Sequence, residues 1–210
     1  MSLFRLDASI LPGTSASAEL AGVIETEWTA GRPGASVVRR DLGSNPLPAD
    51  AWALATTASF TPEEQRTPAQ LEALALATTL AAELEDAEAV LLAVPLYNYG
   101  ISQHFKAWVD LIIAGAGAAT PILKGKPTVL ATVRGGGYGP GTPREGWDHS
   151  TPYLRRVLAD MWGADLTIIE RELTLVGVNP ALDDFKDLAA QLHSDALGAA
   201  RDAGKALATS

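Results

Sequence analysis

The chain has 210 residues, of which 47% are hydrophobic and 20% are charged, a composition typical of one globular domain. Its 25 acidic and 16 basic residues give a formal net charge of -9, which argues against binding to nucleic acid or to an anionic membrane surface. The absence of cysteine excludes disulfides, thiolate metal centres and a thiol nucleophile. Redox chemistry would therefore require a bound cofactor.

The sequence contains no segment that is typical of export or of membrane insertion. Arg5 and Asp7 interrupt the only apolar stretch near the N-terminus, so we expect no signal peptide. The longest uninterrupted apolar run, residues 89–97, is too short to cross a bilayer. We expect one domain over residues 1–210, located in the cytoplasm, with no membrane and no nucleic acid as partners.

Extended and helical patterns alternate along the chain. The predicted strands are residues 2–8, 35–40, 88–94, 127–133 and 166–175. Residues 35–40 end in charge and favour an edge, whereas residues 88–94 have the unbroken hydrophobicity of a central strand. The first predicted helix is recognised by its apolar stripe Leu20, Val23, Ile24 and Trp28. Four further helices are predicted from their capping residues, at Thr67, Ser102, Thr151-Pro152 and Asn179-Pro180. Residues 41–66 are expected to form a long polar connection.

Five strands joined by helical crossovers predict a parallel sheet with helices on both faces, a three-layer α/β sandwich. In such sheets ligands bind beyond the carboxyl ends of the strands, where the strand order reverses. The loops that follow the first, third and fourth predicted strands are therefore the candidates for chemistry.

The first loop, Ser9–Ser17, places hydroxyl groups and a glycine at a helix start, where backbone amides and the helix dipole favour a phosphate. It contains no basic residue and matches neither common nucleotide-binding pattern, which favours a monophosphate held by neutral donors. The alternative is that Ser15 or Ser17 simply caps the helix.

The other two loops suit a flat, partly anionic ring. Pro95–Gly100 combines a turn with an amide and two aromatic rings, and such a turn can clasp a heterocycle. Arg134–Gly141 is rich in glycine, so its amides can form a concave nest for negative charge. The alternatives are tyrosines packed on the domain edge and a flexible surface loop.

The remaining polar and aromatic candidates carry weaker signals. His104, His149 and His193 have no metal-ligand spacing, so we expect no metal site. The sequence contains no G-x-S-x-G nucleophile elbow, which argues against a serine hydrolase of the α/β type. Trp147 is either a lid over the site, hinged at neighbouring glycines, or an anchor on the next helix.

These loops, with Phe105–Leu111 and Thr151–Leu154 behind them, resemble the FMN-dependent NADH:quinone oxidoreductases known as azoreductases. The resemblance spans almost the whole chain, and its most specific parts are Pro95–Tyr99, Ile101-Ser102 and Arg134–Gly136. It implies a flavodoxin-like fold, a homodimer with FMN near the interface, and a ping-pong transfer of two electrons from NAD(P)H to quinones, azo compounds or nitroaromatics. It leaves the choice between NADH and NADPH open.

The resemblance also assigns residues. The FMN phosphate is expected at Ser9, Ser15 and Ser17 with the backbone of Ala16, the ring at Pro95, Leu96, Tyr97, Asn98 and Tyr99, and the pyrimidine edge at Arg134, Gly135 and Gly136. Roles in catalysis fall to Asn98, Tyr99 and Tyr138, the last standing where relatives often have histidine.

Two further expectations concern assembly and access. The apolar side chains of Phe105, Trp108 and Ile112 suggest an isologous dimer across their helix, unless all three face the core of their own subunit. The connection 114–121 lacks a hairpin that relatives often insert, which predicts a more exposed ring. The alternative function is a flavin-free binding or sensory protein with the same fold.

Overall fold

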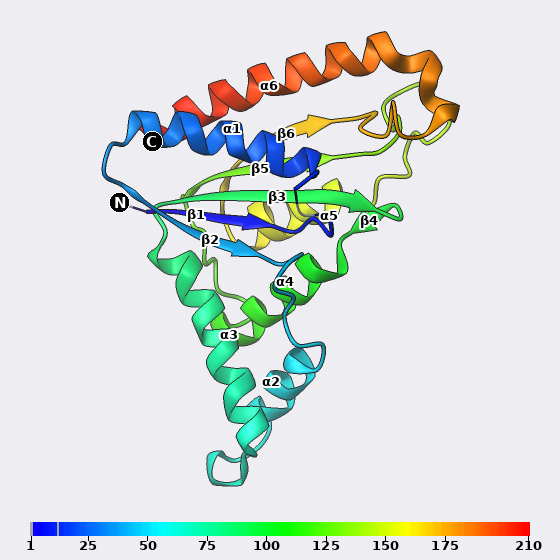
Figure 1. Ribbon diagram of the computed structural model, residues 1–210. Helices are drawn as coiled ribbons and strands as arrows, with labels where there is room; N and C mark the ends of the chain where they lie inside the picture. The colour runs from blue at the N-terminus through cyan, green and yellow to red at the C-terminus, as the bar shows by residue number, and fades with distance from the viewer. Residues whose placement is uncertain (1, 12) are drawn as a thin grey trace.

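The computed structural model describes residues 2–11 and 13–210, and it confirms the predicted α/β sandwich (Figure 1). Met1 and Pro12 lie outside the described residues. The central sheet has the order β2-β1-β3-β5-β6, with all neighbouring strands parallel. A short strand, β4 (Gly100–Ile101), pairs antiparallel with the end of β3. The long strands are β1 (Ser2–Asp7), β2 (Ser36–Asp41), β3 (Ala89–Tyr97), β5 (Pro127–Val133) and β6 (Asp165–Arg171).

Helices cover both faces of this sheet. On one face lie α1 (Ala16–Gly31) and α6 (Lys186–Thr209), which pack against each other. On the other lie α2 (Ala51–Ser59), α3 (Pro68–Asp86), α4 (Gln103–Ala116) and α5 (Thr151–Arg155). A π-helical turn (Arg156–Met161) extends α5, and 3₁₀ turns occupy Glu63–Gln65 and Pro180–Phe185.

The predicted central strand β3 is buried on both faces. Val90, Leu92 and Val94 belong to the core under α3 and α4, while Leu91 and Ala93 belong to the core under α1 and α6. Successive side chains of a strand point to opposite faces, so a strand covered on both sides must be apolar at every position. The charged end of β2 lies at the edge, as its composition predicts.

The starts of α3 and α4 follow the predicted capping residues, whereas the start of α5 does not. Thr67 and Gln70 form a full capping box, and the hydroxyl group of Ser102 accepts the amide of Phe105 at the start of α4. Thr151, however, is the first residue of α5 rather than its cap. The carboxylate of Asp148 accepts the amides of Ser150 and Thr151, and therefore does the capping.

Several element boundaries differ from the prediction. The connection 41–66 contains α2, whose inner face consists of Ala51, Ala55 and Ala58 and therefore gives little hydrophobic contrast. β6 ends at Arg171 instead of residue 175, because the chain turns away at Leu173, which has a positive φ of 58°. The last helix is preceded by a 3₁₀ turn over the predicted start at Pro180.

The helix expected to face a dimer partner faces the core of its own subunit. Phe105, Trp108 and Ile112 are fully buried, and the Trp108 ring contacts Phe4 and Trp162. Helices α3 and α4 approach so closely that a Cβ on Gly115 would collide with the carbonyl group of Ala77. The apolar stripe of α4 is thus explained without a partner, and the argument for a dimer across it is wrong.

The short connection after α4 lies far from the candidate loops. It contains no strand and leads into β5 at the amino ends of the strands, where the amide of Gly125 donates to the carbonyl oxygen of Gly163. The candidate loops lie at the opposite, carboxyl ends. The connection thus lies away from the candidate loops of its own subunit, and the exposure of the ring stays a prediction. Among the described residues, no helix is both long and apolar enough to span a membrane.

Candidate functional site

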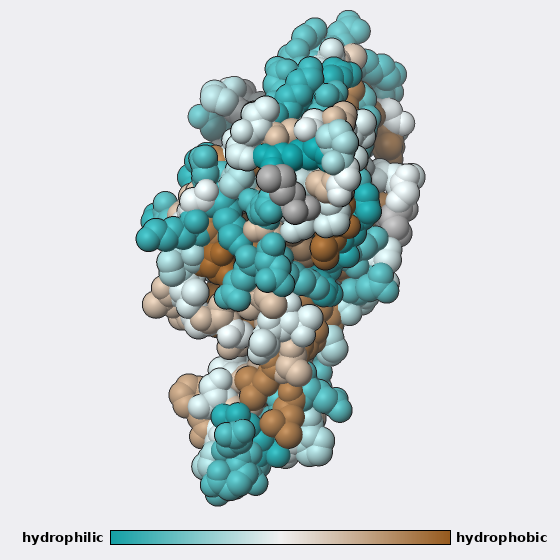
Figure 2. All heavy atoms as spheres, turned by 90° about the vertical axis from the view of Figure 1, so that its left-hand side faces the viewer, coloured by the Kyte–Doolittle hydropathy of each residue, from teal (hydrophilic) through white to brown (hydrophobic). Residues whose placement is uncertain are grey.

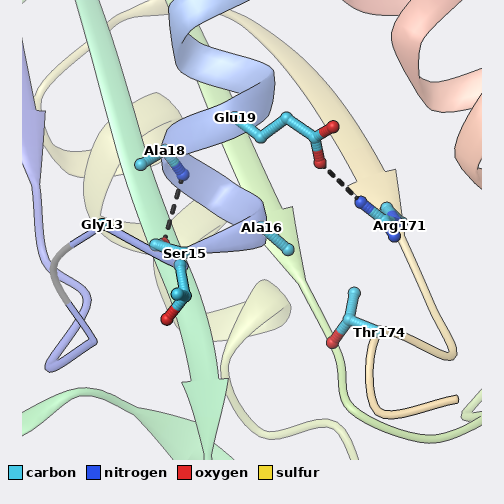
Figure 3. A pocket seen from close by; sticks show the side chains of 8 residues that line it. Gly13, Ser15, Ala16, Ala18, Glu19, Arg171 and Thr174 are labelled. Atoms are coloured by element: carbon cyan, nitrogen blue, oxygen red, sulfur yellow. Dashed lines mark hydrogen bonds and ion pairs between the residues drawn. The ribbon is translucent and has the colours of Figure 1, made fainter. Parts of the chain in front are cut away.

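The loop after β1 and the start of α1 form one wall of a cavity of about 490 Å³ (Figure 3). Ser15 caps α1: its Oγ accepts the amide of Ala18 at 3.2 Å and lies 3.0 Å from Oγ of Ser17, which is fully buried. Ser15 and Ala16 line the cavity. The first-turn amides of a helix have no intrahelical acceptor, so a hydroxyl-capped helix start at a cavity suits a phosphate group.

The opposite wall of this cavity comes from the end of β6. Arg171 forms an ion pair with Glu19 at 2.8 Å, and Thr174 lies beside it (Figure 3). His193 Nε2 lies 2.9 Å from the other Glu19 oxygen. Arg171 therefore offsets the one acidic side chain that lines the cavity, and the cavity can accept an anion.

Ser9 lies outside this cavity, at the point where the strand order reverses between β1 and β3. Its Oγ lies 3.1 Å from the hydroxyl group of Tyr97, which also accepts the amide of Ile10. The ends of β1 and β3 are thereby joined. Ser9 is 7% exposed, so its direct role is to fix the Tyr97 side of the site.

The turn between β3 and β4 has a constrained backbone. Asn98 and Tyr99 both have positive φ, 48° and 67°, as a two-residue hairpin of the I′ type requires. The carbonyl group of Tyr99 accepts the amide of His149 at 2.9 Å, which ties this turn to the glycine-rich segment. Non-glycine residues in the left-handed region often mark functional sites, and two consecutive ones place the Asn98 amide and the Tyr99 ring firmly.

The glycine-rich loop after β5 is held by backbone hydrogen bonds to the loop after β6. The carbonyl groups of Arg134, Gly135 and Gly136 accept amides from Thr174, Leu175 and Leu173, respectively. The amides of Gly135 and Gly136 have no acceptor among the described residues. A Cβ on Gly135 would lie 2.7 Å from Cδ1 of Leu175, so a larger residue here would displace that side chain. Two neighbouring amides without an acceptor are therefore available to a negatively charged group, as the predicted nest requires.

Arg134 has a different role from the one expected. Its side chain is buried and its guanidinium contacts Asp148 at 2.6 Å, Glu170 at 2.7 Å and Glu172 at 3.5 Å. It also donates to Thr151 Oγ1. The positive charge of Arg134 is therefore paired inside the protein, where it holds the glycine-rich loop in place.

Burial and hydrogen bonding act in opposite directions on Asp148. Burial alone would raise the pKa of this carboxyl group, but bonds from the amide and hydroxyl of Thr151 and from Arg134 outweigh it and lower the pKa. For Tyr138 burial is the largest effect and raises the pKa, although Arg144 partly opposes it. The Tyr138 phenol is therefore protonated at neutral pH and can donate a hydrogen bond.

The aromatic residues of the site gather around Tyr99. Its ring centroid lies 6.4 Å from that of Tyr138 and 5.5 Å from that of Trp147, with Trp147 edge-on. Trp147 is 50% exposed, so it packs on the hairpin turn and is not buried against the following helix. The structure therefore brings together Asn98, Tyr99, Tyr138 and Trp147, while Leu96 and Pro95 lie buried beneath the turn.

Several residues of the site lie in residues 166–175, for which the sequence pattern predicts one continuous strand and gives no signal of a site. Glu170 and Glu172 are two apart and both reach Arg134, while Arg171 and Thr174 face the cavity. The pattern Asp148-His-Ser-Thr151 before a helix was the available signal for Asp148, since aspartate is a preferred capping residue.

The network around Arg134 makes a testable prediction. Asp148→Asn keeps the capping oxygen but removes the charge, and we expect it to lower the free energy of unfolding by about 1–3 kcal/mol at neutral pH. The folded pKa of Asp148 lies below its ordinary 3.8, so this stabilisation is present above that value and is lost as the pH falls through the folded pKa. Thermal unfolding of both proteins from pH 7 to pH 3 measures the difference.

The matched control is Asp160→Asn, which removes the carboxylate of an exposed pair with Arg156 and should change stability by less than about 1 kcal/mol. The assigned role would be contradicted if Asp148→Asn and the unmodified protein had the same free energy of unfolding at pH 7. It would also be contradicted if a difference found at pH 7 did not become smaller in acid.

Comparisons with known proteins agree with this geometry. The sequence pattern of a family described as having a flavodoxin-like fold matches residues 1–194. The chain is 40% identical over 204 residues to an FMN-dependent NADH:quinone oxidoreductase of Frankia casuarinae, covering 95% of this chain and 96% of the relative. It is also 40% identical over 208 residues to a protein of the same name from Streptomyces avermitilis, covering 95% of both chains.

Solved structures show the same fold at lower sequence identity. A crystal structure of azoreductase from Bacillus anthracis str. Sterne has a TM-score of 0.78 and 21% identity, covering 98% of this chain and 99% of the other. An FMN-dependent NADH-azoreductase from Bacillus anthracis str. Ames Ancestor, solved in complex with FMN, has a TM-score of 0.78 and 14% identity, with 99% of each chain covered. The chain belongs to the flavodoxin-like family that includes the FMN-dependent NADH:quinone oxidoreductases.

Proposed function

We propose that this protein is an FMN-dependent oxidoreductase that transfers two electrons from NADH to quinones, azo compounds or related aromatic acceptors. The observation that carries the proposal is the meeting of three features at one edge of the sheet. These are the hydroxyl-capped start of α1, the constrained turn at Asn98-Tyr99 and the free amides of Gly135 and Gly136. The names of the relatives support the choice of FMN and NADH.

The site fits FMN part by part. Ser15 and the first-turn amides of α1 would hold the phosphate, in a cavity whose only lining carboxylate, Glu19, is paired. The turn at residues 97–99 would support the flat ring, and Gly135 and Gly136 would meet its anionic pyrimidine edge. Bound FMN supplies the two-electron redox chemistry that the side chains themselves lack.

The residues of the chain contribute binding, orientation and electrostatics. Because the amides of Gly135 and Gly136 are fixed by the ladder to residues 173–175, they can stabilise negative charge without rearrangement. Tyr138 keeps its proton at neutral pH and would donate a hydrogen bond to an acceptor oxygen or nitrogen. Tyr99 and Trp147 offer aromatic surface to a flat acceptor.

The two alternative functions account for these features less well than the proposed oxidoreductase does. A flavin-free binding protein gives no reason for two amides without an acceptor at the same edge of the sheet as a cavity at the hydroxyl-capped start of α1. A serine hydrolase needs an activated serine, yet Ser9 is bonded to Tyr97 and Ser17 is buried against Ser15. We place the protein in the cytoplasm, since NADH is an intracellular reductant and a chain without cysteine needs no oxidising compartment.

A pair of cap variants tests FMN binding through its phosphate. Ser15→Ala should weaken FMN binding about tenfold, the loss expected for one hydrogen bond to a charged group, and leave riboflavin binding unchanged. Thr67→Ala removes the equivalent cap from α3 and should change neither affinity. Flavin fluorescence titrations give the affinities, and NADH oxidation with a quinone gives the activity, with parallel initial-rate lines expected at varied acceptor.

If Ser15→Ala weakened the binding of riboflavin and of FMN by the same factor, the assignment of Ser15 to the phosphate would be contradicted. Failure of the unmodified protein to retain FMN, or to oxidise NADH with any quinone or azo dye, would contradict the proposed function.

We also propose that the protein is a homodimer, on grounds that differ from the α4 argument. The projecting α2–α3 pair exposes Trp52, Leu71 and, at the end of α2, Phe60, which is 86% exposed. Figure 2 shows a group of hydrophobic residues in this lower part of the molecule, above a hydrophilic tip. Exposed apolar surface of this kind favours an isologous contact.

Light scattering with exposed-residue variants tests the dimer. Phe60→Asp should convert a dimer to a monomer with little change in melting temperature, because the side chain has few contacts within the subunit. Val178→Asp, at a residue 75% exposed elsewhere, is the control and should remain dimeric. A monomeric mass for the unmodified protein at micromolar concentration would refute the proposal.

A further inference from the structure

A second cavity of about 610 Å³ adjoins the candidate flavin site on the outer side of the glycine-rich loop. We call it the side pocket. Its walls are mostly apolar and come from the loop after β6, the 3₁₀ turn and the start of α6: Leu173, Leu182, Phe185, Leu188 and Leu192. Its volume is within the range of small-molecule sites.

The side pocket opens beside the aromatic residues of the site. Tyr99 and Trp147 line it together with Gly137, which follows the two glycines assigned to the flavin edge. Trp147 stands edge-on to Tyr99, so the two rings form a corner between the hairpin turn and the pocket. A flat acceptor placed at Tyr99 would therefore extend into the side pocket.

The charges on its walls are not equivalent. Glu172 lines the side pocket, but its carboxylate accepts the amides of Tyr138 at 3.0 Å and Gly139 at 3.3 Å. Arg144 also lines it and has no carboxylate within 4.0 Å among the described residues. Its guanidinium lies 5.9 Å from the ring centroid of Tyr138, and a Cβ on Gly136 would collide with it.

The guanidinium of Arg144 thus brings a positive charge without a carboxylate partner to the wall of this pocket, in a chain whose net charge is -9. Next to apolar walls and aromatic rings, it complements an aromatic ligand that carries negative charge. A planar guanidinium binds sulfonate or carboxylate oxygens through two parallel hydrogen bonds, and partial removal of water strengthens the attraction.

We propose that the side pocket binds the part of the acceptor remote from its reducible group, and that Arg144 selects aromatic acceptors with an anionic substituent such as a sulfonate or carboxylate. The inference rests on the proposed function and names the substrate class of that site. Arg144 is a specificity residue: it binds the substituent and takes no part in electron transfer.

A matched pair of ligands tests the charge preference. The FMN-loaded protein is titrated calorimetrically with a para-sulfonated dimethylaminoazobenzene and with the corresponding neutral sulfonamide. The unmodified protein should bind the sulfonate about tenfold more tightly, a difference of about 1.4 kcal/mol. Arg144→Gln should remove most of this preference while leaving the affinity for the sulfonamide, and for FMN itself, unchanged.

Two further variants separate charge from location. Arg156→Gln removes an exposed cation outside the pocket and should leave the preference intact. Leu188→Ala, at a half-exposed residue of the wall, should weaken both ligands several-fold with their ratio preserved. The ratio of kcat/KM values for the two dyes with NADH should follow the binding ratio in every variant.

The inference would be overturned if the Arg144→Gln variant still preferred the sulfonate. It would also be overturned if this variant bound FMN more weakly with an unchanged preference, because Arg144 would then belong to the flavin site. If the unmodified protein binds the sulfonate preferentially but oxidises no NADH with either dye or a quinone, the proposed function fails while the side pocket stands.

Discussion

The guanidinium of Arg134 lies buried between three carboxylates and a hydroxyl group, and this network joins the ends of β5 and β6 to the start of α5. A buried charge is tolerated only when it is paired and hydrogen-bonded, so the partners must stay in register. Asp148 both pairs with Arg134 and caps α5, which fixes the segment that carries Trp147 and His149. The geometry of the proposed flavin edge depends on this network.

Backbone hydrogen bonds connect the Arg134 network to the other loops of the candidate site. The carbonyl groups of residues 134–136 accept the amides of residues 173–175, which fixes the glycine backbone, while the amides of Gly135 and Gly136 have no acceptor among the described residues. The Tyr97 hydroxyl joins the ends of β1 and β3, and the His149 amide joins the β3–β4 turn to the glycine-rich segment. Loops that would be mobile alone are in this way bound to one another, which is the preorganisation that electrostatic stabilisation of a ring requires.

Much of this could be predicted from the sequence, and the failures have physical causes. The strand positions, the central place of residues 88–94 and the capping box at Thr67-Pro-Ala-Gln70 follow from local patterns, whose signals need no tertiary contact. The roles of Arg134 and Glu172 could not be predicted, because their partners lie 14 to 38 residues away and meet only when the strands align. The stripe of Phe105, Trp108 and Ile112 was attributed to a partner because a sequence does not show which apolar face its own sheet covers.

Amide chemical shifts on addition of flavins test the central claim most directly. FMN should shift the amides of Ala16 and Ser17 at the helix start and those of Gly135 and Gly136 at the nest. Lumiflavin, which has the same ring but no ribityl phosphate, should shift Gly135 and Gly136 and leave Ala16 and Ser17 in place. Shifts at Ala16 and Ser17 with lumiflavin, or unchanged Gly135 and Gly136 with both ligands, would contradict the account.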